Sequence, residues 1–129
     1  MIKKLLMFSL ISVLLTACSE DKLMNFFGES KNWQVKYSVN VFDEKSESSK
    51  VTIRYIGEKP VPKKIKYTVE TATGKTGGET TIENGVLGTG EDSCSGCSIT
   101  QENEKITATI TWNDKTETVN LKNNEKILH

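Results

Sequence analysis

The sequence has very few of the residues that enzymes use as bases. Its single histidine, His129, is the last of 129 residues, so Ser-His-Asp and Cys-His arrangements have no base. A zinc site needs about four ligands, which the few cysteines and one histidine do not supply. This inventory predicts a protein that is not an enzyme and binds no metal or cofactor.

Pairs of acidic residues are the one catalytic pattern that the residue inventory does not exclude. Asp43-Glu44 and Glu91-Asp92 lie in segments expected to be loops, and the geometry of a glycosidase-type carboxylate pair is spatial, so the sequence neither supports nor removes it. With Glu47, these carboxylates offer weak calcium ligands, but the spacing of a calcium loop is absent.

Excess positive charge is also lacking. The whole chain has 17 basic and 17 acidic residues, and Arg54 is the only arginine. Nucleic-acid binding needs a basic stripe with groove-reading elements, so the balance argues against a nucleic-acid partner.

The first residues form a short export signal. Lys3 and Lys4 precede an apolar run that ends at Leu15, which is too short for a comfortable transmembrane span. Leu15-Thr16-Ala17-Cys18 resembles the lipobox of bacterial lipoproteins, in which the cysteine receives a diacylglycerol and the signal is cut before it. The alternative is an ordinary secretory signal with a cysteine nearby by chance.

Three segments follow from this interpretation. Residues 1–17 are a lipoprotein signal peptide, residues 18–30 are a lipid-anchored tether, and residues 31–129 are one domain. The protein is then expected on the extracytoplasmic face of the cell membrane, held by Cys18. The apolar part of the tether covers the core or lies against the bilayer, and core cover is favoured.

From Trp33 onward the apolar residues alternate with polar ones, which predicts half-buried strands. The clearest hairpin is KITATITW, an Asn113-Asp114 turn, and ETVNL. Residues 43–50 and 73–78 are expected to be a loop and a turn, and a short strand is expected around residues 98–101. Seven or eight short strands predict an all-β fold, a single antiparallel β-sandwich of immunoglobulin-like type, with a small barrel as the alternative.

Two residues separate Cys94 from Cys97. The pair has three possible roles: a redox site, part of a metal site, or a local structural disulfide. No helix is expected beneath them to lower a thiol pKa, and lipidation of Cys18 leaves an even, extracytoplasmic pair, so a local disulfide is favoured. It would fix the loop 91–98, which we treat as a candidate binding loop. Its candidate contact residues are Glu91, Asp92, Ser95 and Gly96.

A lysine-rich segment, KPVPKKIK, occupies residues 59–66. Its basic residues are Lys59, Lys63, Lys64 and Lys66. They form a candidate patch for anionic lipid headgroups or an acidic partner. The alternative, which is favoured, is an edge strand protected from aggregation by lysine and proline.

Two motifs give a family resemblance. GES-x-x-W at residues 28–33 and ITWNDKTETVNL at residues 110–121 resemble those of small surface lipoproteins of Bacillus-type Gram-positive bacteria. Some lipoproteins of this kind are encoded on mobile elements and act as exclusion or immunity factors against a conjugation machine. The resemblance implies a non-enzymatic binding protein with a membrane or envelope protein as partner. The alternative is a thiol-disulfide accessory lipoprotein that uses Cys94 and Cys97.

Overall fold

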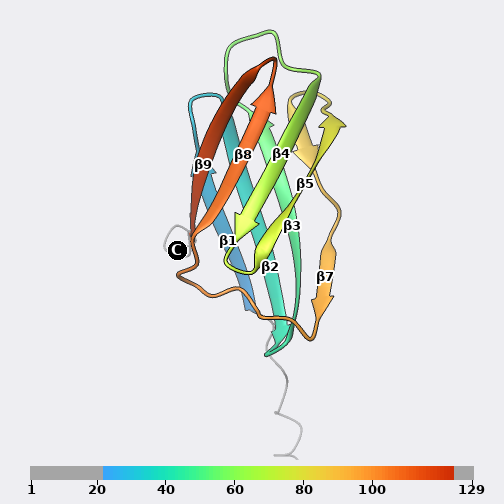
Figure 1. Cartoon of the computed structure of the whole chain (residues 1–129), viewed down its shortest axis with the longest axis vertical. Coiled ribbons are helices and arrows are strands. Elements are labelled where there is room, and N and C mark those ends of the chain that lie inside the picture. The colour runs from blue at the N-terminus through green and yellow to red at the C-terminus, as the bar shows by residue number, and fades with distance from the viewer. Residues whose placement is uncertain (1–21, 124–129) are drawn as a thin grey trace, which may run out of the picture.

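A computed structural model describes residues 22–123, which form nine strands and no helix (Figure 1). All strand pairs are antiparallel, so the predicted all-β, antiparallel fold is confirmed. No helix in this range is long and apolar enough to cross a membrane. The expected signal peptide, 1–17, and Cys18 lie outside the described residues.

The strands alternate with short connections along the chain. Their bounds are β1 Lys22–Glu29, β2 Trp33–Asp43, β3 Ser46–Tyr55, β4 Lys64–Thr71, β5 Gly74–Thr81, β6 Val86–Gly88, β7 Asp92–Ser95, β8 Ile106–Trp112 and β9 Lys115–Asn123. The spatial order is β5-β4-β8-β9-β1-β2-β3-β6, and β7 pairs with β3.

The sheet curls so that its two halves face each other across the core. One half contains β1, β2, β3, β6 and β7, and the other contains β4, β5, β8 and β9. Within residues 22–123, the halves are joined only where β1 meets β9, with Phe26 opposite Asn123 and Phe27 opposite Lys122. This arrangement gives the two packed layers of a sandwich.

The core follows the period-two pattern, because successive side chains of a strand point to opposite faces. It is built from one face of β1, β2, β3, β4, β8 and β9, with Ile82 added after β5. Trp33 and Trp112 pack edge to face with ring centroids 5.3 Å apart, and Tyr55 packs on Trp33 at 5.1 Å. The two tryptophans predicted to anchor the core therefore contact each other inside it.

The segment assigned to the tether is partly a strand, which corrects the predicted boundary between residues 30 and 31. Residues 22–29 form β1 and pair along their whole length with β2. Met24 and Phe26 are 1% and 0% exposed. The favoured interpretation, that these apolar residues cover the core, agrees with this burial.

Three local predictions were wrong. The loop expected at residues 43–50 is a turn at Glu44 and Lys45, and β3 already begins at Ser46. The turn expected at residues 73–78 mostly belongs to β5, because β4 offers it a complete ladder. The strand expected at residues 98–101 is absent, and β7 forms earlier, at Asp92–Ser95.

Candidate functional site

The loop that contains Cys94 and Cys97 is attached to the outer edge of β3. β7 pairs with the start of that strand, and Cys94 lies opposite Glu47. A disulfide joins Cys94 to Cys97, whose Cα atoms are 6.1 Å apart. Gly96 has a φ of +74°, a conformation that glycine adopts without strain, and this allows the short loop to close.

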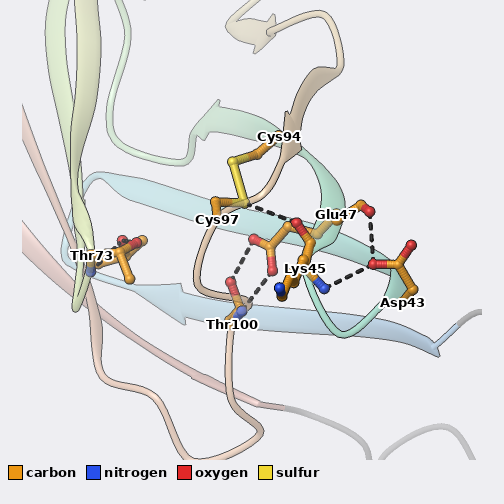
Figure 2. The surroundings of a disulfide bond; sticks show 9 residues. Asp43, Lys45, Glu47, Thr73, Cys94, Cys97 and Thr100 are labelled. Atoms are coloured by element: carbon orange, nitrogen blue, oxygen red, sulfur yellow. Dashed lines mark hydrogen bonds between the residues drawn. A yellow bond between two sulfur atoms is a disulfide. The ribbon is translucent and has the colours of Figure 1, made fainter.

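The loop is also held from below by the β2–β3 turn (Figure 2). The Cys97 backbone N–H donates to Lys45 O at 3.0 Å. Asp43 shapes that turn by accepting hydrogen bonds from Lys45 N at 2.8 Å and Ser46 Oγ at 2.7 Å. These bonds, first that from the Lys45 backbone, lower the pKa of Asp43. Disulfide and turn therefore form one connected unit.

A buried carboxylate fixes the chain beyond the disulfide. Glu47 is 9% exposed and accepts hydrogen bonds from Thr100 N at 2.6 Å and Thr100 Oγ1 at 2.8 Å. Figure 2 shows both bonds beside Cys97. The sequence predicts a loop at residues 43–50 and offers Glu47 as a weak calcium ligand. Instead, Glu47 is an even number of residues from the buried Val51 and Ile53, so the three side chains lie on the same face of β3. This spacing was the sequence signal that could have indicated the burial of Glu47.

The disulfide closes one side of a hollow of about 400 Å³ at the open side of the curled sheet. Its lining residues are Tyr37, Glu47, Ser49, Thr73, Asp92, Cys94, Cys97 and Ser98. Burial raises the pKa of Tyr37, with a contribution from the nearby carboxylates Glu47, Glu104 and Asp92, while a hydrogen bond with Ser49 opposes the shift. Among residues 22–123, no three His, Cys, Asp or Glu side chains gather as metal ligands would.

The four candidate loop residues remain accessible. Glu91, Asp92, Ser95 and Gly96 are all exposed. Asp92 reaches the hollow behind the disulfide, whereas Ser95 and Gly96 line a shallower depression beside the β2–β3 turn. The structure thus places Asp92 on one surface of the loop and Ser95 and Gly96 on another.

The lysines of residues 59–66 are separated into two groups. Lys64 and Lys66 belong to β4, where Lys64 Nζ lies 2.8 Å from Glu79 Oε1 and Lys66 lies opposite Glu79. Lys59 and Lys63 lie in the β3–β4 connection. Glu79 therefore pairs with Lys64 and lies opposite Lys66, and the loop lysines carry the candidate basic surface.

The β3–β4 connection, residues 56–63, adds exposed apolar side chains that sequence reasoning did not identify. Ile56 is 41% and Val61 is 37% exposed. The connection is fixed by the Ile56 N–H, which donates to Asn32 O at 2.8 Å, and by the Tyr55 hydroxyl, which donates to Glu58 O at 2.5 Å. We call residues 56–63 the apolar-basic loop.

The apolar-basic loop and the disulfide loop lie at opposite ends of the molecule. The β3–β4 connection arches over the upper end in Figure 1, whereas β7 points to the lower end. Lys22, where β1 begins, is also at the lower end, since it pairs with Val41 next to the β2–β3 turn. The structure therefore offers two separate candidate surfaces.

A polar cluster stabilises the upper end beside the apolar-basic loop. Glu117 on β9 accepts hydrogen bonds from Ser30 Oγ at 2.6 Å, Asn32 N at 3.0 Å and Asn32 Nδ2. Partial burial opposes ionisation of Glu117, but these bonds outweigh it, and the pKa lies below its usual value. Since Asn32 O also accepts from Ile56 N, the cluster fixes the start of the loop.

No protein-family model, curated protein or solved structure matches this chain.

Proposed function

We propose that this chain is a lipid-anchored, non-enzymatic binding protein on the extracytoplasmic face of the cell membrane. Its most concrete role is that of an exclusion or immunity factor that contacts a component of a conjugation machine. The anchor follows from the lipobox-like Leu15–Cys18, and the role from the resemblance to surface lipoproteins.

The short spacing between the anchor and the domain supports this proposal. β1 begins at Lys22, four residues after Cys18, and an extended chain of that length spans about 13 Å. The domain is therefore held close to the lipid, where it meets components of a membrane-embedded machine.

The apolar-basic loop is the observation that carries the proposal. Ile56 and Val61 expose apolar surface beside Lys59 and Lys63, on a backbone fixed by hydrogen bonds. A preorganised apolar contact next to positive charge suits a protein partner with an acidic, partly apolar surface. The partner is therefore an envelope or membrane protein that presents carboxylates.

The test measures how often cells acquire a conjugative element. Deletion of the gene should raise acquisition, and Lys59→Glu/Lys63→Glu should reproduce much of that rise, because the charge reversal repels an acidic partner. Lys36→Glu, which reverses an exposed lysine on β2, is the matched control and should behave as wild type. Unchanged acquisition in the deletion strain refutes the exclusion role.

The thiol-disulfide alternative has its own test. Cys94 is exposed, as a redox site requires, but both flanking segments are strand or loop, without the helix N-terminus that lowers a thiolate pKa in thioredoxin-like sites. Reduction of insulin by the wild type, lost in Cys94→Ser/Cys97→Ser, would favour this alternative over the binding role.

A further inference from the structure

β5 presents a long unpaired edge. It pairs with β4 in unbroken register from Thr81 opposite Lys64 to Gly74 opposite Thr71, and no strand within residues 22–123 covers its other side. Seven of its eight residues are exposed, so the edge is accessible. It has neither a proline nor a bulge, which are two of the devices that prevent edge pairing, and it contains a single lysine, Lys75.

The opposite side of the sheet has no comparable edge among the described strands. It ends in β6, of three residues, and β7, of four, which lie one after the other along β3. Short edge strands are a common protection against further pairing. A partner strand is therefore best accommodated at β5.

The outward face of β5 has charges that complement themselves. Thr76 and Thr80 lie opposite the buried Val69 and Ile65, so the side chains of Lys75 and Glu79 point outward. A second β5, antiparallel and aligned with Gly77 opposite Gly77, places Lys75 of each copy opposite Glu79 of the other. Opposite charges in directly facing positions stabilise a strand pair.

The complementarity continues into β4. Glu70 lies opposite Lys75, and Lys66 lies opposite Glu79. On the outward face, a row of four side chains then crosses the junction. Glu70 and Lys75 come from one copy, Glu79 and Lys66 come from the other, and negative and positive charges alternate along the row. On the inner face the same register sets Thr76 opposite Gly78, and a Cβ built on Gly78 meets no atom within 4 Å. Space for the threonine is therefore available.

We propose that β5 is a homodimer edge, to which a second copy of this chain adds its own β5 in antiparallel register centred on Gly77. The inference rests on the strand pairing of the described residues and does not depend on the lipid anchor or on the role in exclusion.

A charge-exchange experiment tests the register. Lys75→Glu places four acidic side chains at the junction of a homodimer, and Glu79→Lys places four lysines there, so each variant should dimerise at least about tenfold more weakly than wild type. When the two variants are mixed, both facing positions again carry opposite charges. The mixture should therefore form a heterodimer with affinity near that of the wild-type homodimer.

Sedimentation of the full chain in mild detergent, over a dilution series, measures these affinities. Lys36→Glu is the control, since it reverses one exposed charge on β2 and should leave dimerisation unchanged. Circular dichroism of each variant verifies folding. Monomeric wild type at every concentration, undiminished dimers in both single variants, or no heterodimer from folded variants overturns the proposal.

Discussion

At the scale of single residues, Glu47 has the strongest structural role in the disulfide region. Its carboxylate is buried and accepts both hydrogen bonds from Thr100. Glu47→Ala leaves a backbone N–H and a hydroxyl without partners, which should cost roughly 2–4 kcal/mol of unfolding free energy. Glu47→Gln retains an acceptor and should cost less.

Urea unfolding measures this difference, with Glu44→Ala as the control. Glu44 is exposed in the neighbouring turn, and its replacement should change stability by less than about 0.5 kcal/mol. Equal stability of Glu47→Ala and Glu44→Ala would show that the Thr100 contacts do not contribute.

Glu117 predicts a pH-dependent stability. Partial burial opposes its ionisation, but the hydrogen bonds from Ser30 and Asn32 lower its folded pKa below the ordinary 4.5. The ionised form therefore stabilises the fold above pH 4.5, and this contribution is lost as pH falls through the folded pKa. Glu117→Gln should be less stable than wild type at neutral pH, by about 1 kcal/mol, with the difference disappearing in acid.

Thermal unfolding of wild type and Glu117→Gln, from neutral pH down into acid, measures this difference. Glu58→Gln, in the neighbouring loop, serves as the control because the Glu58 side chain is exposed. A Glu117→Gln difference that is constant with pH would mean that the charge of the carboxylate does not matter.

At the scale of elements, β1 is the strand on which the two halves of the sheet depend. It pairs fully with β2 and, among the described residues, is the only strand of its half that pairs with the other half, through β9. Phe26→Ala should therefore cost about 3–5 kcal/mol. Leu23→Ala on the same strand is the matched control, because Leu23 is 61% exposed, and its cost should stay within about 0.5 kcal/mol.

Chemical denaturation of both variants distinguishes a strand from a tether. If residues 22–29 were only a tether, Phe26→Ala and Leu23→Ala would unfold at the same denaturant concentration as wild type.

The disulfide should contribute little to stability compared with β1. It encloses a very short loop, for which loop-closure entropy predicts about 2 kcal/mol or less. Cys94→Ser/Cys97→Ser should therefore remain folded, since the β3–β7 ladder and the Cys97 N to Lys45 O bond do not require the sulfurs. Unfolding in the presence and absence of reductant provides the measurement, and loss of the native β-sheet spectrum would contradict it.

The alternation of apolar and polar residues predicted the strands that bury one face. It did not predict strands, such as β5, in which apolar residues do not alternate with polar ones. Trp33–Val41 and Ile106–Trp112 repeat buried residues at every second position, so their strands were correctly located. β5 exposes nearly all of its residues and contains Gly77 and Gly78, so only its pairing with β4 makes it a strand. Such a contact between segments has no local sequence signature.

The candidate site was only partly predictable for the same reason. The accessibility of Glu91 and Asp92 follows from a polar, glycine-rich segment. The buried role of Glu47 depends on Thr100, which is far away in the sequence. Lys64 forms an ion pair with Glu79 of the neighbouring strand, whereas Lys59 and Lys63 lie in the loop before β4. Each outcome required knowledge of which strands are neighbours.

At the scale of the whole molecule, the proposed membrane attachment depends on Cys18. Cys18→Ala should remove the diacylglycerol site and release the protein from the membrane fraction or leave it as an uncleaved precursor that is not lipidated. Membrane fractionation and mass spectrometry of the N-terminus measure the outcome. Cys94→Ser/Cys97→Ser is the control and should stay anchored. A Cys18→Ala protein with an unchanged lipid adduct would refute the lipobox interpretation.

The proposed dimer has a defined arrangement of anchors. Because the two β5 strands are antiparallel, the two Lys22 ends lie at opposite ends of the pair, and so do the two apolar-basic loops. Two anchors in one bilayer then require the strands to lie along the membrane surface. Cys18→Ala should leave β5 pairing unchanged, which separates dimerisation from anchoring.

The position of β1 also determines how the domain responds to mechanical force. A pull between the lipid and a partner held at the apolar-basic loop enters the fold at Lys22 and acts along the direction of β1. The β1–β2 hydrogen bonds are then loaded together in shear, because the ladder runs the length of the strand parallel to the force. Bonds that share a load in this way resist extension better than bonds that are opened one at a time. Under the proposed anchoring, we therefore expect the β1–β2 ladder to resist a pull on Lys22.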